Sequence, residues 1–212
     1  HFAATGKSRE SLEALVIEVD IQRKAFGETV VLKDIKLTIQ SGETLALLGP
    51  SGIGKTTLLR IVAGLDAEFD GTIRRPDAMA MVFQEPTLLP WRTALQNITL
   101  VTEVTDAIAK AALVDVGLEG KEGFFPNQLS LGQQRRLSLA RAFAIKPELL
   151  VMDEPFASLD GKRVKEMVSL SRRLIDDVNV TTLLVTHSEV EAKAMADRIV
   201  RIDGHPARLI SS

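Results

Sequence analysis

The hydrophobic pattern of this chain consists of short apolar runs separated by polar or glycine-containing turns. Residues 45–48 and 149–152 form two apolar runs of four residues, and residues 181–186 are a further expected strand. Such runs are typical of strands buried on both faces of a parallel sheet. Residues 15–21 and 30–39 instead alternate apolar and polar positions over part of their length, which predicts antiparallel strands with one solvated face.

Helical periodicity occupies the stretches between the buried strands. Residues 107–116 and 137–144 carry apolar side chains at roughly helical spacing, and Pro147 follows the second segment. Asp160 is the expected N-cap of a long helix that reaches about residue 178. The remaining expected elements are a helix over 58–63, a strand over 79–83, a short helix from 189, and terminal strands over 198–202 and 207–210.

Glycines and polar pairs mark where these elements should end. Gly27 and the Ser41-Gly42 pair predict turns in the N-terminal part of the chain. Gly64 and the Asp70-Gly71 pair are interpreted as breaks after the helix over 58–63.

The order of these elements predicts the fold class. Strands that alternate with helices around a mainly parallel sheet are typical of α/β proteins. The stretch 93–145 is predominantly helical and is interpreted as an inserted α-helical subdomain. Residues 12–92 and 146–212 are then the core of one domain over 1–212, with the antiparallel strands as an N-terminal β-subdomain.

Composition excludes several classes of function. The net charge of −2 gives no basic field for nucleic acid, so we expect no nucleic-acid partner. There is no cysteine, which excludes disulfides, thiolate metal sites and thiol catalysis, and fits a reducing compartment. No apolar run approaches the length of a membrane span, and the first residues lack a signal-peptide pattern. Any membrane role is therefore expected to come through a partner.

One glycine-rich segment carries a specific chemistry. Residues 49–57 read GPSGIGKTT and lie between a buried strand and an apolar helix. Glycines allow backbone N–H groups to turn inward around an anion, and the positive end of the following helix points to the same place. Lys55 supplies charge for the β- and γ-phosphates, and the Thr56 hydroxyl can ligate Mg²⁺. The alternative, a glycine turn with an unrelated lysine, leaves the strand and helix on either side unexplained. The predicted nucleotide-binding residues are Gly49, Pro50, Ser51, Gly52, Ile53, Gly54, Lys55, Thr56 and Thr57.

Polar residues follow three further strands. Ligands of open parallel sheets bind beyond the carboxyl ends of the strands. The polar residues at these strand ends are therefore expected to lie near residues 49–57, the phosphate-binding loop, or P-loop. Asp153 is the expected Mg²⁺ ligand, together with Thr56 and Gln84. Glu154 can orient or deprotonate the water that attacks the γ-phosphate, and Gln84 and His187 are the other catalytic candidates.

Each of these residues also has a purely structural interpretation. Asp153 and Glu154 can form a solvated turn, Gln84 can cap its strand, and a lone histidine after a strand is often structural. His1 and His205 lack any motif and are expected to be exposed. Trp91, the single tryptophan, is either core filler or a docking residue for a partner, and we favour docking.

Taken together, these motifs resemble those of ATP-binding cassette (ABC) transporter nucleotide-binding subunits. The segment LSLGQQRR over 129–136 is similar to the LSGGQ signature, Gln84 to the Q-loop, His187 to the switch histidine and 158–160 to the D-loop. The resemblance extends from about residue 15 to residue 202. It implies a P-loop NTPase core of the RecA-like type, ATP and Mg²⁺ as cofactors, and ATP hydrolysis. It also implies further nucleotide contacts from Phe26, Ser130, Gly132, Gln133 and Asp160.

Two residues depart from the family pattern. Leu131 occupies the place of the first glycine of the signature, while Ser130 and Gly132 keep the groups expected to face phosphate. Phe26 stands where the family usually has a tyrosine or tryptophan that stacks on adenine. Stacking requires only the π-face, so phenylalanine is expected to serve.

The resemblance further implies partners and a location. Two cassettes, identical or different, would enclose two ATP molecules, with Ser130 and Gly132 acting on the nucleotide of the other copy. Permease subunits would dock near residues 84–92, whose sequence is similar to importers of the nitrate, sulfonate and taurine class. A periplasmic binding protein would act indirectly, and the chain would lie at the cytoplasmic face of the membrane.

Other functions remain open at this level. The chain could serve another ABC transporter, or a soluble ABC-type ATPase acting on DNA or ribosomes. The latter is disfavoured because the chain is one cassette without cysteines or long heptads. A P-loop kinase or switch protein would leave the motif over 129–133 unexplained.

Overall fold

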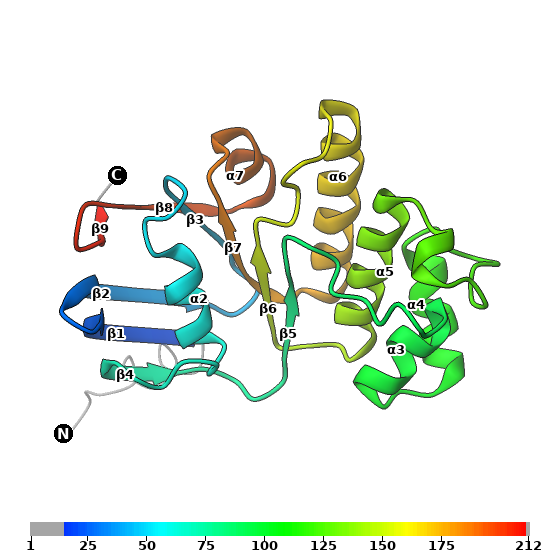
Figure 1. Ribbon diagram of the computed structural model, residues 1–212, viewed down its shortest axis with the longest axis horizontal. Helices are drawn as coiled ribbons and strands as arrows, with labels where there is room; N and C mark the ends of the chain where they lie inside the picture. Colours follow the sequence, from blue (N-terminus) through cyan, green and yellow to red (C-terminus); the bar gives the residue numbers. More distant parts are fainter. Residues whose placement is uncertain (1–14, 211–212) are drawn as a thin grey trace, which may run out of the picture. The chain divides into compact units, whose positions relative to one another are not determined.

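The computed structural model describes residues 15–210, and these form two compact units. One unit contains residues 15–77 and 181–210, and the other contains residues 78–180. The expected exposure of His1 and the start of the core at residue 12 lie outside the described residues. Figure 1 labels the helices and strands of both units.

The first unit begins with the predicted antiparallel sheet. Strand β1 (Leu15–Phe26) lies between β2 (Thr29–Gln40) and β4 (Asp70–Arg74), and both pairings are antiparallel. Alternate residues of the second half of β2 are buried, as the polar alternation predicted. The turn at Gly27 separates β1 from β2, with a positive φ of 59°.

The predicted break at Asp70-Gly71 is wrong, because these two residues begin β4. Gly71 pairs with Ile21 across the sheet, with φ of 146°. A Cβ atom at Gly71 would lie 2.1 Å from the carbonyl oxygen of Asp20. The glycine therefore permits close approach of two backbones within a strand, and does not end one.

The first unit also contains a second set of paired strands, in the order β7-β3-β8-β9. Strand β3 (Thr44–Leu48) pairs in parallel with β7 (Thr181–Thr186) and with β8 (Arg198–Asp203). All five residues of β3 are buried, as expected for a strand with neighbours on both sides. Strand β9 (Arg208–Ile210) closes the edge in antiparallel orientation. The helices of this unit are α2 (Lys55–Val62) and α7 (Glu189–Met195).

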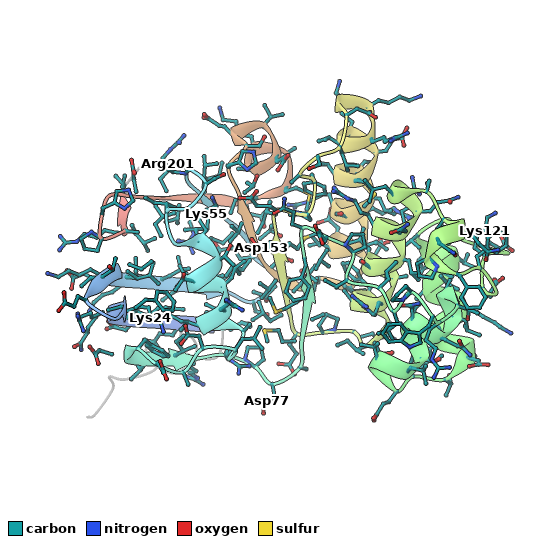
Figure 2. The ribbon with its side chains drawn as sticks, in the orientation of Figure 1. Lys24, Lys55, Asp77, Lys121, Asp153 and Arg201 are labelled. Atoms are coloured by element: carbon teal, nitrogen blue, oxygen red, sulfur yellow. The ribbon has the colours of Figure 1, made fainter. Side chains whose placement is uncertain are left out.

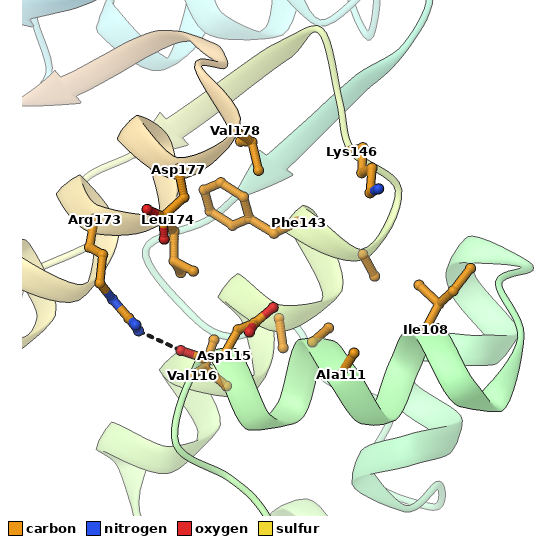
Figure 3. Close-up of a pocket in the computed structure, with 13 residues that line it drawn as sticks. Ile108, Ala111, Asp115, Val116, Phe143, Lys146, Arg173, Leu174, Asp177 and Val178 are labelled. Carbon is orange, nitrogen blue, oxygen red and sulfur yellow. Dashed lines mark hydrogen bonds between the residues drawn. The ribbon is translucent and has the colours of Figure 1, made fainter.

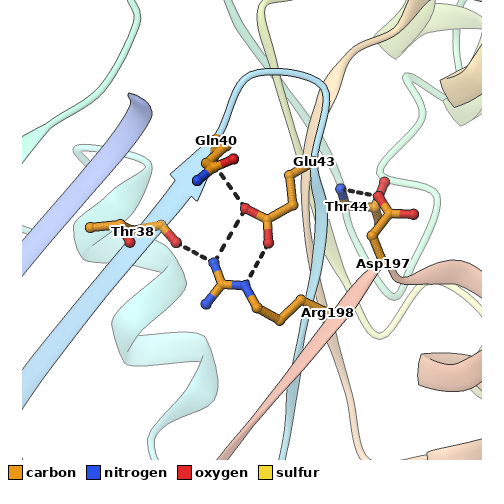
Figure 4. Close-up of polar contacts among 6 residues, drawn as sticks. All are labelled: Thr38, Gln40, Glu43, Thr44, Asp197 and Arg198. Carbon is orange, nitrogen blue, oxygen red and sulfur yellow. Dashed lines mark hydrogen bonds and ion pairs between the residues drawn. The ribbon is translucent and has the colours of Figure 1, made fainter. Parts of the chain in front are cut away.

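Polar contacts fix the beginning of β3 against β8. The guanidinium of Arg198 donates to both carboxylate oxygens of Glu43 and to the carbonyl oxygen of Thr38 (Figure 4). Beside it, Thr44 N donates to Asp197 Oδ2 at 2.8 Å. Burial by itself would raise the pKa of Glu43, but hydrogen bonds from Arg198 and from the Gln40 backbone outweigh it and lower that pKa below 4.5.

The second unit combines two parallel strands with the helical segment. Strands β5 (Met79–Val82) and β6 (Leu149–Asp153) pair in parallel. The strand over 79–83 is thus confirmed with its end one residue earlier. The helices of this unit are α3 (Ala94–Thr102), α4 (Asp106–Asp115), the short 3-10 helix η1 (Pro126–Gln128), α5 (Leu131–Ala144) and α6 (Gly161–Val178).

Short polar residues begin the long helices of the second unit. Thr93, Thr105, Ser130 and Asp160 each accept a backbone N–H of the first turn of the helix that follows. These contacts satisfy backbone donors that would otherwise lack a partner at a helix start. The N-cap predicted at Asp160 is confirmed. Within residues 15–210, every helix is too short or too polar to cross a lipid bilayer.

Candidate nucleotide-binding site

The P-loop lies in the first unit, between the end of β3 and the start of α2. Gly49 is the first residue after β3 and lies against β8. A Cβ atom at this position would lie 2.5 Å from the carbonyl oxygen of Ile202. Gly52 and Gly54 have φ values of 78° and 111°, in the region that disfavours side chains. Gly54 is also the N-cap of α2. These glycines let the loop turn its N–H groups inward at a helix N-terminus, the arrangement that binds phosphate.

Lys55 extends back along this loop. Its side chain is buried, and Nζ donates to the carbonyl oxygens of Gly49 and Pro50, both at 2.8 Å. A lysine ammonium is a compact charge that can be shared between such carbonyls and phosphate oxygens. Ser51 and Thr56, two further hydroxyl residues of the same segment, are exposed. Figure 2 labels Lys55 at the start of α2.

The structure brings His187 to the P-loop within the first unit. Gly49 N donates to the carbonyl oxygen of Thr186 at 3.4 Å, and Thr186 is the last residue of β7. His187 follows directly and is exposed. The Thr186 hydroxyl donates to the Glu191 carboxylate at 2.6 Å, which ties the start of α7 to the end of β7. The histidine therefore stands on a fixed turn beside the glycine-rich loop.

Phe26 and His205 also lie in the first unit. Phe26 is the last residue of β1, and 56% of it is exposed, which fits a base-stacking platform. His205 is exposed, as expected.

The second unit holds the carboxylates. Asp153 is the last residue of β6, and Glu154 follows it with a positive φ of 44°. A non-glycine residue in this region costs about 1–3 kcal/mol and is concentrated at functional sites. Because Val82 pairs with Met152, Gln84 leaves β5 at the same edge of the strand pair as Asp153 and Glu154 leave β6. The structure thus brings Gln84 and the two carboxylates together within this unit.

Helix α5 holds the loops that follow both of these strands. Arg135 donates to the carbonyl oxygens of Pro155 and Ala157, after Glu154. Ser138 donates to the carbonyl oxygen of Pro86 at 2.6 Å, and Arg141 donates to that of Thr87 at 3.0 Å. None of these three contacts was predicted from the sequence, because the carbonyl partners lie 20, 52 and 54 residues away. Ser138 and Arg141 carry a signal, since they are the polar residues of the otherwise small and apolar segment 137–144, whereas Arg135 lies among other polar residues.

The signature residues form a capping box at the start of α5. The Ser130 hydroxyl accepts from Gln133 N, and Gln133 Oε1 accepts from Ser130 N at 3.0 Å. Gln133 therefore has a local structural role, which motif reading did not foresee. Leu131 is 44% exposed, on the first turn. In the D-loop, Asp160 Oδ1 accepts from Arg163 N and caps α6.

Each unit carries oxygen donors of a kind that Mg²⁺ accepts in nucleotide sites. Within residues 15–210 there is no group of three or more acidic or histidine side chains placed to hold a metal. Magnesium in nucleotide sites takes one or two protein ligands and completes its shell with phosphate oxygens and water. Thr56, an exposed threonine in the first turn of α2, and Asp153, at the end of β6, carry donors of that kind.

A separate cavity in the second unit has a different character. It has a volume of about 430 Å³ and lies between α4, α5 and α6 (Figure 3). Its wall is formed mainly by alanines and by Val116, Phe143 and Leu174, and none of the predicted site residues lines it. Arg173 crosses one end, with Nη2 donating to the Asp115 carbonyl oxygen at 2.6 Å. The cavity is therefore distinct from the nucleotide-binding residues.

Comparison with known proteins agrees with the P-loop chemistry. The sequence model of the ABC transporter family matches residues 32–157. The chain is 44% identical over 202 residues to the aliphatic sulfonates import ATP-binding protein SsuB 2 of Rhizobium johnstonii, covering 93% of this chain and 80% of that protein. It is 46% identical over 188 residues to SsuB 3 of Paraburkholderia xenovorans, covering 88% and 76%.

Solved structures support the fold. A structure of cbiO1 from Clostridium perfringens superposes with a TM-score of 0.83 over 93% of this chain and 88% of that one, at 24% identity. A dimeric structure of the ATP-binding cassette MJ0796, in a post-hydrolysis state with ADP and Pi, superposes with a TM-score of 0.75 at 29% identity, covering 88% and 94%. The predicted α/β P-loop fold is confirmed. The chain belongs to the ABC transporter family, in which it is an ATP-binding subunit with ATPase activity.

Proposed function

We propose that this chain powers the import of aliphatic sulfonates or closely related anions through a membrane permease. The observation that carries the substrate class is the similarity to aliphatic sulfonates import ATP-binding proteins. Three of these proteins are 39–46% identical to this chain, and the matched residues cover 76–82% of each protein's length. The loop over 84–92 supports the same class by its resemblance to nitrate, sulfonate and taurine importers. Selectivity for the solute would reside in the permease and in a periplasmic binding protein.

In this proposal each half of the site has its own task. Lys55 and the P-loop N–H groups hold the β- and γ-phosphates of ATP. Thr56, Asp153 and Gln84 would hold Mg²⁺, which would supply positive charge to neutralise the phosphates. Glu154 orients or deprotonates the attacking water, and His187 holds that water and the γ-phosphate in line. The positive φ of Glu154 supports its role, because such backbone strain is concentrated at functional sites. The position of His187 directly after Thr186, whose carbonyl oxygen accepts from Gly49 N of the P-loop, supports the role of the histidine.

A second cassette completes the site in the proposed mechanism. Ser130 and Gly132 lie at the N-terminus of the 14-residue helix α5, whose positive end favours phosphate. Ser130 retains its hydroxyl proton as a donor while its oxygen accepts from Gln133. Two cassettes in head-to-tail arrangement would each give the other these groups, while Gln133 and Asp160 shape the contact. ATP then closes the pair, and hydrolysis opens it.

Trp91 is the proposed contact with the permease, at the cytoplasmic face of the membrane. It is 66% exposed, in the loop between β5 and α3. A large exposed aromatic side chain is a typical anchor of protein interfaces. Its loop is joined to α5 through Ser138 and Arg141, so movement at the docking loop would reach the signature helix.

Growth on sulfonates tests the proposed substrate. A strain lacking this chain should fail to grow with an aliphatic sulfonate as the sole sulfur source and should grow normally on sulfate. The parent chain should restore growth on the sulfonate, and Lys55→Ala should not, because it removes the phosphate-binding charge. Normal growth of the deletion strain on sulfonates, nitrate and taurine would contradict this substrate class.

A further inference from the structure

Lys24 is a buried cation on β1 that the family motifs do not include. It is 1% exposed, and its Nζ donates to Asp66 Oδ1 and to the carbonyl oxygen of Glu68, both at 2.7 Å. The hydrogen bond from Lys24, together with one from the Glu68 backbone, lowers the pKa of Asp66, so the carboxylate is charged. A buried charge is tolerated when it is paired and hydrogen-bonded in this way.

The same ammonium lies over the ring of Phe26. Lys24 Nζ is 4.6 Å from the ring centroid, within the range of a cation–π interaction. Lys24 and Phe26 are two residues apart on β1, so they share one face of the strand. Figure 2 labels Lys24 in this sheet. Lys24 Nζ lies over one face of the ring, the inner face, and Phe26 as a whole is 56% exposed, which leaves the opposite, outer face as the one that a ligand could reach.

A purely structural ion pair would not require the ring. A lysine ammonium has three N–H donors, and Asp66 and Glu68 take two of them. The ring of Phe26 lies on a remaining side of the ammonium. The cation draws π-electron density toward the inner face and so reduces the negative potential of the outer face. That potential opposes face-to-face stacking of a second ring.

We propose that Lys24 is a positioning residue for base recognition, which fixes and polarises the Phe26 ring so that its outer face stacks on adenine. This inference rests on the proposed stacking role of Phe26. The contacts of Lys24 also connect the residue proposed to bind the base with the helix that begins at the phosphate-binding loop. Asp66 and Glu68 follow α2, the helix that begins with the phosphate-binding Lys55. The base platform is therefore anchored to the same element as the phosphate loop.

Lys24→Met tests this role on the whole chain by calorimetric titration with Mg-ATP and with inorganic tripolyphosphate. We expect ATP affinity to weaken about three- to tenfold, in line with a partly desolvated cation–π contact. Tripolyphosphate affinity should stay within twofold, because the probe has no base. The KM for ATP should rise by the same factor as the Kd, while kcat changes less than twofold, and Lys24→Arg should recover most of the ATP affinity.

A matched control and a second variant keep the test decisive. Lys36→Met removes an exposed lysine of the same sheet, paired with Asp20, and should bind both probes as the parent does. If Lys24→Met does not fold, Lys24→Met/Asp66→Asn removes both charges and should show the same loss toward ATP alone. Equal weakening toward ATP and tripolyphosphate, or parental ATP affinity in a folded variant, would overturn the proposal.

Phe26→Ala separates this inference from the function on which it rests. Loss of ATP affinity in Phe26→Ala with none in Lys24→Met would overturn the role of Lys24 alone. Parental ATP affinity in Phe26→Ala would overturn the stacking assignment, and with it the inference. Weakening in both variants, without further loss in the double variant, is the expected result.

Discussion

Arg135 donates through Nη2 to the carbonyl oxygen of Ala157, and thereby joins the signature helix to the loop that follows Glu154. A second bond, from Nη1 to the carbonyl oxygen of Pro155, is 3.1 Å long. The guanidinium is buried, which lowers the pKa of Arg135, and two carbonyl groups serve as its partners. The position of the proposed catalytic carboxylate thus depends on a side chain of the helix that would serve the other copy.

Arg135→Met should therefore impair hydrolysis more than binding. Displacement of the loop after Glu154 by about 1 Å can cost up to about a hundredfold in rate. We expect kcat to fall about ten- to hundredfold with ATP affinity within twofold, measured by steady-state kinetics and calorimetry. Arg173→Met is the control, because Arg173 also donates to a carbonyl oxygen in the second unit, that of Asp115, at the cavity that none of the proposed site residues lines. Equal kcat in Arg135→Met and Arg173→Met would show that the loop contact is dispensable.

Glu154→Gln should separate ATP binding from turnover. The amide keeps the size of the side chain but loses the charge that activates water, so hydrolysis should fall by about a hundredfold or more. ATP affinity should remain within about threefold. The variant should also accumulate as an ATP-bound dimer in size-exclusion chromatography. A variant that hydrolyses ATP at the parental rate would remove Glu154 from the role of base.

The isolated monomer should be a poor ATPase. Ser130 and Gly132 are proposed to act on the nucleotide of another cassette, so the specific activity should rise with chain concentration. The measurement is the rate per chain across a dilution series, with the monomer fraction followed by light scattering. Full activity at dilutions where the chain is monomeric would contradict the shared site.

Gly49→Ala should destabilise the first unit as well as abolish binding. Its Cβ would lie 2.5 Å from the carbonyl oxygen of Ile202, and a backbone atom cannot give way cheaply. Overpacking of this kind costs about 1–3 kcal/mol of unfolding free energy, measurable by urea denaturation. Gly123→Ala is the matched control, since no atom lies within 4 Å of its added Cβ. Equal stability of the two variants would show that the contact with β8 relaxes freely.

The Glu43–Arg198 pair should contribute stability only above acidic pH. The folded-state pKa of Glu43 is lowered below 4.5, so the contribution is fully present above about pH 4.5 and is lost as the pH falls below that value. Arg198 is 44% exposed, so the contribution is about 1 kcal/mol or less. The stability difference between the parent and Glu43→Gln should therefore shrink from pH 6 to pH 3 in urea denaturation. When Arg198→Met is added to both the parent and Glu43→Gln, the difference in unfolding free energy between the two should vary less with pH. The same pH dependence with and without Arg198 would contradict the pairing.

The local pattern was sufficient to predict most secondary structure and the P-loop. Residues 45–48 and 181–186 read as buried strands because a strand enclosed on both sides can carry only apolar or small polar side chains. The glycines of 49–54 and Lys55 form a motif whose chemistry is contained in adjacent residues, so no distant contact was needed to recognise it. Asp160 was recognisable as an N-cap for the same reason, since a cap acts within one helical turn.

Tertiary contacts decided the rest, because their cause lies far away in the sequence. Gly71 reads as a break until β1 lies beside it, where close backbone approach makes glycine necessary. Nothing in the local sequence marks Arg135 and Lys24 as buried, since charged side chains are rarely buried without partners. The partners of Arg135 lie 20 and 22 residues away and those of Lys24 lie 42 and 44 residues away, so only the folded chain could bring them together. The sequence by itself indicated which residues are proposed to hold ATP, because their motif is local, and the tertiary structure decided which distant residues hold those groups in place.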